Sequence, residues 1–433
     1  RENIMTRETH IWHPYTRFST LRAAPLPIMV KGEGIYLYDE AGNRYVDAIS
    51  SWWACALGHG HPRIIAAIQK QVAELQHSIL GNLSHPRAEE LAERLANLMP
   101  TRQRHVLFAS DGASAVEAAL KIALQYAHNT GHPERKKLAY LEDAYHGDTL
   151  GAVAVGYLEA FHKPFENLLA PSIRLPVPAG ADQEEACFTE TVRRLEQHRD
   201  EIAALIVEPL CQGAAGMKMY SASYLRRLTD LFQNRGLPLI VDEIATGFGR
   251  TGSLFAFEQA GIDPDIVCVG KALSAGYLPI SAALVKDEIY QTFDDQPVDH
   301  SFYHGHTFCG NPIAAAAALE ALKIYQEDQI VEKAVQLGKL IKRHLSLLQS
   351  LEHVKEIRCL GCIGAVEMKS IEAARRIRDR LFEQRILARP LGPVVYLMPP
   401  LNTPPDVITE VAQQLCEIIR ETENAECRMP NAD

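Results

Sequence analysis

Short apolar runs alternate with longer segments of helical periodicity between about residue 60 and residue 320. Several of these runs are almost entirely apolar, as strands covered on both faces should be. Between them, residues 62–75 and 114–127 have apolar positions every three to four residues, and the first begins with Pro62, so both predict helices. This alternation predicts an α/β fold with a mostly parallel sheet, whose strands are residues 105–109, 138–141, 203–207, 237–241, 266–269 and 280–285.

The pattern changes on both sides of this central region. After residue 320, amphipathic helices are predicted at 371–384 and 407–421, around short apolar pieces at 364–368 and 394–398. In the first 58 residues, glycines separate short runs such as 35–38, which predicts a small sheet. We therefore expect an N-terminal segment, 1–58, that joins a small α+β domain, 320–433, beside a large domain, 59–319.

Composition narrows the class of protein. The 433 residues are 47% hydrophobic and 23% charged, as in ordinary globular proteins. A net charge of -10 argues against nucleic acid as a partner. No apolar run is long enough for a membrane span or signal peptide, and an odd number of cysteines, nine, favours a reducing compartment. We expect a cytoplasmic protein without a membrane partner, and no metal, because the single Cys-x-x-Cys, Cys359 and Cys362, lacks a second pair.

Two neighbouring predicted strands end in residues with complementary chemistry. The stretch LPLIVDEIATGFGRTG, 237–252, runs apolar to Asp242, and DIVCVGKALSAG, 265–276, runs apolar to Lys271. Ligands of open α/β sheets bind at the carboxyl ends of the strands. A partly desolvated lysine amine can form a Schiff base with an aldehyde, and a carboxylate can pair with a pyridinium nitrogen. Together, Lys271 and Asp242 predict pyridoxal phosphate as a cofactor. Taken alone, Lys271 also fits an ordinary surface lysine, and Asp242 fits a helix-capping aspartate.

Three further segments suit such a ligand. In FASDGASAVEAALKIA, 108–123, the backbone N–H groups of Gly112 and Ala113 would face a phosphate at a helix N-terminus, although a plain capped helix has the same pattern. Tyr145 and His146 follow a predicted strand, and the tyrosine ring would stack on a pyridine or pack in the core. Glu208, after the strand at 203–207, would contact the cofactor or a substrate-binding arginine.

These segments, in this order and over nearly the whole chain, resemble the class III aminotransferases of fold type I pyridoxal phosphate enzymes. DEIATGFGRTG and GKALSAGYLPIS are the most specific matches. The resemblance implies the pyridoxal-phosphate transferase fold, with residues 59–319 as the cofactor-binding domain. It makes Lys271 the Schiff-base lysine and general acid/base, Asp242 the partner of the pyridine nitrogen, Tyr145 the stacking ring, and Gly112 with Ala113 the phosphate turn.

The resemblance also implies a homodimer with a shared active site. HGHTFCGNP, 304–312, matches the segment by which the partner completes the phosphate site, so Thr307 would reach across, with Gly305 beside the substrate. The sequence departs from the family at Ala113, where Ser or Thr is usual. A hydroxyl contact to the phosphate is then lost unless Ser114 substitutes.

Three segments resemble the biotin-biosynthesis branch of the class, which converts 8-amino-7-oxononanoate to 7,8-diaminononanoate: IWHPYT at 11–16, SSWWAC at 50–55 and ARPLGPVVYLMPP at 388–400. The resemblance implies a substrate pocket formed by Tyr15, Trp52, Trp53, Arg389 and Tyr396, with Tyr15 also in the catalytic set. Arg389 would hold the distant carboxylate of the substrate.

Alternatives to this reading remain open. The tryptophans also fit a buried structural pair, and Arg389 a surface ion pair. S-adenosylmethionine is the expected amino donor, with lysine as the alternative. A different class III omega-aminotransferase, acting on ornithine, 4-aminobutyrate or a diamine, and a non-catalytic scaffold are the competing functions.

Overall fold

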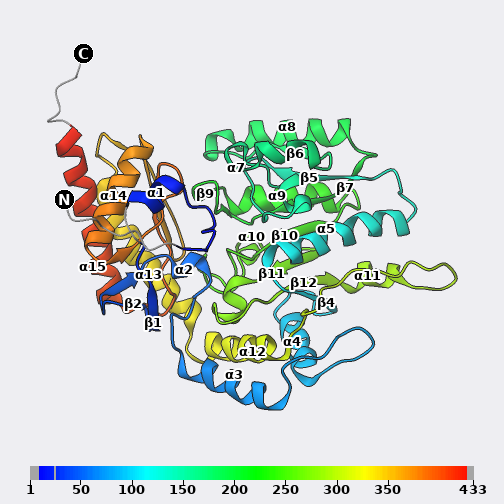
Figure 1. The fold of residues 1–433 in the computed structure, drawn as a ribbon. Helices are drawn as coiled ribbons and strands as arrows, with labels where there is room; N and C mark the ends of the chain where they lie inside the picture. The colour runs from blue at the N-terminus through cyan, green and yellow to red at the C-terminus, as the bar shows by residue number, and fades with distance from the viewer. Residues whose placement is uncertain (1–8, 24–25, 427–433) are drawn as a thin grey trace.

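The computed structural model describes residues 9–23 and 26–426 (Figure 1). The outer ends of the expected N-terminal segment and small domain, and Cys427, therefore lie outside the described residues. Within the described ranges, no helix is long and apolar enough to cross a membrane.

A seven-stranded sheet forms the centre of the large region. Its strands lie in the order β4-β12-β11-β10-β7-β5-β6, and every pairing is parallel except the two made by β12. All six predicted strands are confirmed to within about two residues, and β6 is an additional, unpredicted edge strand. The bounds are β4 Arg104–Ala109, β5 Lys137–Leu141, β6 Ile173–Leu175, β7 Ile202–Val207, β10 Leu239–Asp242, β11 Ile266–Val269 and β12 Ser281–Lys286.

Helices cover both faces of this sheet, which is why its central strands are apolar throughout. Along β7, Leu205 and Val207 pack into one core cluster while Ala204 and Ile206 pack into another. Helix α5 (Gly112–Asn129) belongs to the second cluster, and α9 (Ala222–Gln233) covers the opposite face. The alternation of side chains along a strand thus buries both faces.

The C-terminal region has its own antiparallel sheet, β13-β14-β16. Helices α13, α14 and α15 belong to the same region (Figure 1). The N-terminal strands pair with one another and then, through β3 and β15, with this region, since Val46 lies opposite Ile386 in a parallel pair. The bounds are β1 Met29–Glu33, β2 Tyr36–Asp39, β3 Arg44–Asp47, β13 Val354–Leu360, β14 Ile363–Met368, β15 Ile386–Leu387, β16 Val394–Leu397, α13 Ile330–Leu345, α14 Ile371–Glu383 and α15 Pro405–Glu426.

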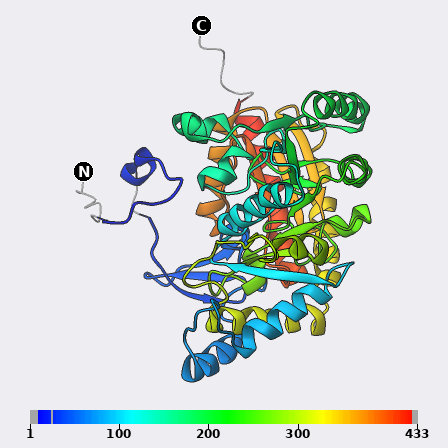
Figure 2. The ribbon, with the colours of Figure 1, turned by 90° about the vertical axis from the view of Figure 1, so that its right-hand side faces the viewer.

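Helix α12 (Pro312–Glu327) lies beside α3 (Pro62–Glu74) in both views (Figures 1 and 2). The expected domain boundary at 319/320 falls inside this helix. The division of the chain into three parts stays a proposal. The remaining elements are α1 Phe18–Ala23, α2 Ser50–Trp53, α4 Pro86–Asn97, α6 Leu150–Ala154, α7 Glu159–His162, α8 Glu184–Gln197, α10 Phe257–Ala260, α11 Asp287–Tyr290, β8 Cys211–Gln212 and β9 Lys218–Met219.

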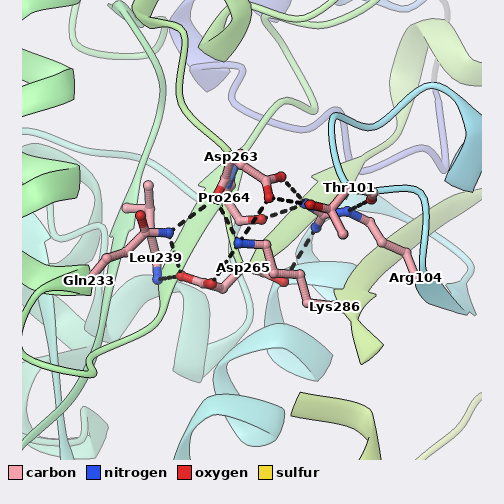
Figure 3. Close-up of polar contacts among 8 residues, drawn as sticks. All are labelled: Thr101, Arg104, Gln233, Leu239, Asp263, Pro264, Asp265 and Lys286. Carbon is pink, nitrogen blue, oxygen red and sulfur yellow. Dashed lines mark hydrogen bonds and ion pairs between the residues drawn. The ribbon is translucent and has the colours of Figure 1, made fainter. Parts of the chain in front are cut away.

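A network of hydrogen bonds and ion pairs lies at the edge of the sheet where the parallel strands begin (Figure 3). The buried guanidinium of Arg104, at the start of β4, lies 2.5 Å from an oxygen of Asp263. Lys286, at the end of the antiparallel β12, pairs with Asp263 and Asp265 at 3.1 Å each. Asp265 also accepts a hydrogen bond from the backbone N–H of Leu239, the first residue of β10. The network thus joins three strands at the edge opposite the carboxyl ends of the parallel strands.

Candidate active site

Asp242 and Lys271 lie at the carboxyl ends of adjacent strands, as predicted. Asp242 ends β10, which pairs in parallel with β11, and Lys271 follows β11 after Gly270. Lys271 has a φ of +42°, a left-handed conformation that is costly for a side chain with a Cβ. Burial lowers the pKa of its ammonium group, against the opposing charges of Asp242 and Glu208. A lysine in this setting is more readily deprotonated than an exposed one.

Asp242 is buried and held from two sides. One carboxylate oxygen lies 2.7 Å from Nδ1 of His146, and the other accepts a hydrogen bond from the backbone N–H of Ile244 at 3.0 Å. His146 is itself buried, and its Nε2 atom has no hydrogen-bond partner among the residues that the structure describes. Buried polar atoms are usually paired, so an unpartnered nitrogen beside the carboxylate marks a place for a polar ligand.

Glu208 lies at the carboxyl end of β7, directly after Val207. Its two carboxylate oxygens accept hydrogen bonds from the backbone N–H groups of Tyr145 and Gly213, each at 2.9 Å. Burial raises the pKa of this carboxyl to about 7, and the nearby His146 opposes the rise. Both oxygens are therefore engaged within the chain, where they fix the backbone that carries Tyr145.

Tyr15 and Tyr145 both donate hydrogen bonds to Asp148, a residue that the sequence analysis did not predict. The hydroxyl of Tyr15 donates to Asp148 at 2.5 Å, and that of Tyr145 donates to the other oxygen of Asp148 at 2.9 Å. Burial and the Asp148 hydrogen bond raise the pKa of Tyr15 to about 12, and burial also raises the pKa of Tyr145. The available signal was the acid three residues after Tyr145 in AYHGDT.

The two tryptophans face different partners. The guanidinium of Arg389 lies 3.9 Å from the ring centroid of Trp52, and the indole N–H of Trp53 donates to the hydroxyl of Tyr396 at 3.0 Å. The amine of Lys271 lies 5.0 Å from the ring centroid of Trp53. Arg389 makes no ion pair with any other described residue, so the structure does not support the surface ion pair that the sequence left open.

The segment predicted to bind phosphate lies at the N-terminus of helix α5, and its role stays a prediction. Helix α5 begins at Gly112, where a Cβ atom would lie 2.9 Å from the side chain of Ile244. The side chain of Ala113 packs against Gly147. A Cβ atom added at Gly147 would lie only 2.4 Å from the Cβ atom of Ala113. Ser114 donates its hydroxyl to the carboxylate of the N-cap residue, Asp111, at 2.9 Å. The Ser114 hydroxyl is therefore already engaged in capping the helix.

Gly305 and Thr307 are exposed and lie on the segment before α12. In the part of the chain that the structure describes, neither is hydrogen-bonded to Lys271, Asp242 or the residues around them. Their expected contact with a partner chain stays a prediction. The described residues also hold no cluster of three or more side chains arranged to bind a metal ion.

Comparisons with known proteins agree with this geometry. The family described as Aminotransferase class-III matches residues 20–419. The adenosylmethionine-8-amino-7-oxononanoate aminotransferase of Geobacter sulfurreducens is 38% identical over 416 residues, 90% of this chain and 91% of the relative. The crystal structure of the enzyme of that name from Methanocaldococcus jannaschii is 36% identical, with a TM-score of 0.91 over 95% of this chain and 97% of the other.

An amine transaminase from an uncultivated Pseudomonas species, solved in its PLP-bound form, is 31% identical, with a TM-score of 0.89 over 98% of this chain and 100% of the other. These matches extend across the sheet, the Lys271 turn and the C-terminal region alike. The chain therefore belongs to the class III aminotransferases, as the sequence motifs predicted.

Proposed function

We propose that this aminotransferase converts 8-amino-7-oxononanoate to 7,8-diaminononanoate, with S-adenosylmethionine as amino donor and pyridoxal phosphate as cofactor. The observation that carries the proposal is the combination of Lys271 and Asp242 at one sheet edge with a wall in which Arg389 lies over Trp52. The names of the curated relatives support the same substrate. The proposal includes a cytoplasmic homodimer whose partner contributes Thr307 and Gly305.

The residues at the sheet edge fit the cofactor. Lys271 would carry it, Asp242 would pair with its ring nitrogen, and the Gly112–Ala113 turn would receive its phosphate through backbone N–H groups. The unpartnered Nε2 of His146 and the narrow cradle at Gly112 support this assignment. When bound, pyridoxal phosphate withdraws electrons from the carbon that bears the amino group and so makes its C–H bond acidic.

The chain's own groups then handle binding and proton transfer. Lys271 Nζ, whose pKa burial lowers, would take the proton from the donor carbon and pass it to the cofactor carbon to which the lysine had been bonded, and the second half of the reaction would run the same transfer in reverse. His146 and the N–H of Ile244 fix the orientation of Asp242. Asp148 fixes the hydroxyls of Tyr15 and Tyr145, which would line the path of the substrate.

Arg389 is the natural anchor for the far end of the acceptor. Its guanidinium is half-buried, lies 3.9 Å from the ring centroid of Trp52, and has no carboxylate partner among the described side chains. A planar fork of N–H donors can hold a carboxylate at two points, and a hydrogen bond to a charged group contributes about 1.5–3 kcal/mol. Trp52, Trp53 and Tyr396 would enclose the apolar chain between this anchor and Lys271.

The visible absorption spectrum of cofactor-loaded protein tests the proposal. S-adenosylmethionine, added without acceptor, should convert the cofactor to its amino form, and 8-amino-7-oxononanoate should then reverse the change. Lysine is added separately as the alternative donor, and Lys271→Ala is the control that should show neither conversion. Reversal by 2-oxoglutarate but not by 8-amino-7-oxononanoate would favour an omega-aminotransferase of different specificity. Failure to bind the cofactor at all would favour the scaffold.

A further inference from the structure

The segment that carries both tryptophans has a left-handed backbone. Ser50, Ser51, Trp52 and Trp53 have φ values of +50°, +43°, +68° and +75°. The backbone N–H of Trp53 donates to the carbonyl of Ile49 at 2.9 Å, so the segment is a left-handed helical turn. No glycine relieves the clash between each Cβ and the following carbonyl. Such a turn persists only where surrounding contacts hold it.

Asp47, the last residue of β3, lies three residues before Ser50, the start of this turn, and is almost completely buried. One of its oxygens accepts a hydrogen bond from the hydroxyl of Ser51 at 2.7 Å and lies 2.9 Å from Nε2 of His59. Its other oxygen is 3.3 Å from the backbone N–H of Ile49. One carboxylate thus reaches the residue before the turn, a side chain inside it, and a histidine beyond it.

His59 fixes Asp47 from the far side. Its backbone exchanges two hydrogen bonds with Gly34, and its side chain packs so closely on Gly32 that a Cβ added at Gly32 would lie 2.7 Å from the Cβ atom of His59 and 2.9 Å from its ring. Burial alone would lower the pKa of His59, but hydrogen bonds and charges from Asp47 and Cys55 raise it to about 9. The imidazole is therefore protonated at neutral pH, and the two residues form a buried ion pair.

The left-handed turn aims its two rings at different parts of the site. Trp52 lies beneath Arg389 and edge-on to Tyr15, with ring centroids 5.7 Å apart. Trp53 faces the amine of Lys271. In a right-handed turn or a strand the Cβ directions of these neighbouring residues would differ, so the same two rings would not meet the same partners.

We propose that Asp47 is a positioning residue for the substrate pocket, which holds the Ser50–Trp53 turn left-handed through Ser51 and His59 so that Trp52 and Trp53 form the two walls between Arg389 and Lys271. The inference rests on the proposed function for the identity of the acceptor. The geometry of the turn does not depend on the proposed function. Asp47 touches neither the cofactor site nor the acceptor anchor, so its effect is on recognition rather than on proton transfer.

The test compares Asp47→Asn with Asp39→Asn. Asp39 is a matched control because it ends the neighbouring strand β2, is also buried, and accepts hydrogen bonds from Asn43 and Tyr45 within its own hairpin. Both variants are made in a Trp12→Phe background. The protein has three tryptophans, so its fluorescence then reports Trp52 and Trp53 alone.

Asp47→Asn should raise the KM for 8-amino-7-oxononanoate by about tenfold with kcat changed less than about twofold. Acrylamide quenching of the tryptophan pair should rise by about twofold. Asp39→Asn should leave both quantities at the parent values, even where it lowers the melting temperature. Adding Ser51→Gly to Asp47→Asn should recover part of the loss in KM, because glycine adopts a positive φ without strain.

Equal KM and equal quenching for Asp47→Asn and Asp39→Asn would overturn the inference. If Asp47→Asn fails to unfold cooperatively, Ser51→Ala makes the same comparison while removing a single hydrogen bond. The proposed function fails separately, when the parent protein does not turn over 8-amino-7-oxononanoate. In that case the quenching comparison, which needs no substrate, still decides whether Asp47 holds the tryptophans.

Discussion

The Asp47–His59 ion pair should make the stability of this protein fall between neutral and alkaline pH. The pKa of His59 is about 9 in the folded chain and about 6.5 in an unfolded one. Between these values the folded state binds the proton that the unfolded state has released. The stabilisation is therefore complete below about pH 6.5 and disappears as pH rises through about 9.

The size of the effect follows from the difference between the two pKa values. One pKa unit corresponds to about 1.4 kcal/mol, so the contacts of His59 with Asp47 and Cys55 together contribute on the order of 3 kcal/mol below pH 6.5. The side chain of His59 is 12% exposed and that of Asp47 is 1% exposed, so solvent screens the pair little. The depressed pKa of Asp47 reflects the same interaction and adds no second contribution.

Urea unfolding curves at pH 6.5 and 9.5 measure this effect in the parent protein, in Asp47→Asn and in Asp39→Asn. Asp47→Asn removes the part of this contribution that Asp47 makes, so the parent and Asp39→Asn should both lose more unfolding free energy over this range than Asp47→Asn does, by at most about 3 kcal/mol. Other groups titrate in all three proteins and cancel in the comparison. Parallel pH dependences for the parent and Asp47→Asn would show that Asp47 does not raise the pKa of His59 and would refute the reasoning.

Four further outcomes are expected. Lys271→Ala should abolish turnover while the protein still binds pyridoxal phosphate noncovalently, as seen in the visible spectrum. Arg389→Lys should raise the KM for the acceptor by about tenfold or more, because a single ammonium cannot form the two-point contact; an unchanged KM would place the carboxylate elsewhere. Asp263→Ala should lower the unfolding free energy by about 3 kcal/mol without changing that KM, as measured in urea, because a buried guanidinium loses its partner. Tyr15→Phe and Asp148→Ala should together reduce kcat/KM no more than the larger single change, since they remove one shared hydrogen bond; additive losses in the double-mutant cycle would contradict this.

The strands were predictable because each is a short apolar run between polar or small residues. Strand β11 was predicted at its observed limits, since Asp265 and Gly270 bound the run on either side. Helix α5 starts two residues earlier than predicted because the carboxylate of Asp111 caps it. The unpredicted β6 is three residues long, with Arg174 at its centre, and lies at the sheet edge, where the hydrophobic signal is weakest.

The site was predictable only in part, for a physical reason. Lys271 and Asp242 follow apolar strands, so the topology of the sheet alone brings them together. The link from Tyr15 to Asp148 joins residues 133 positions apart, and no local pattern encodes it. The left-handed turn at Ser50–Trp53 is likewise invisible, because it contains none of the glycine or asparagine that usually marks a positive φ.

The residues expected to transfer the proton and those expected to bind the acceptor are held in place by different kinds of contact. Lys271 and Asp242 follow strands whose positions the sheet core sets, so proton transfer depends on packing that most of the large region shares. The tryptophan wall depends instead on single long-range contacts, such as the hydroxyl of Ser50 on the carbonyl of Met398 and the indole of Trp53 on Tyr396. Each of those contacts joins residues more than 340 positions apart in the chain. Because few bonds hold the wall and many hold the sheet, substitutions among the wall contacts should change which acceptor binds before they change how the proton moves.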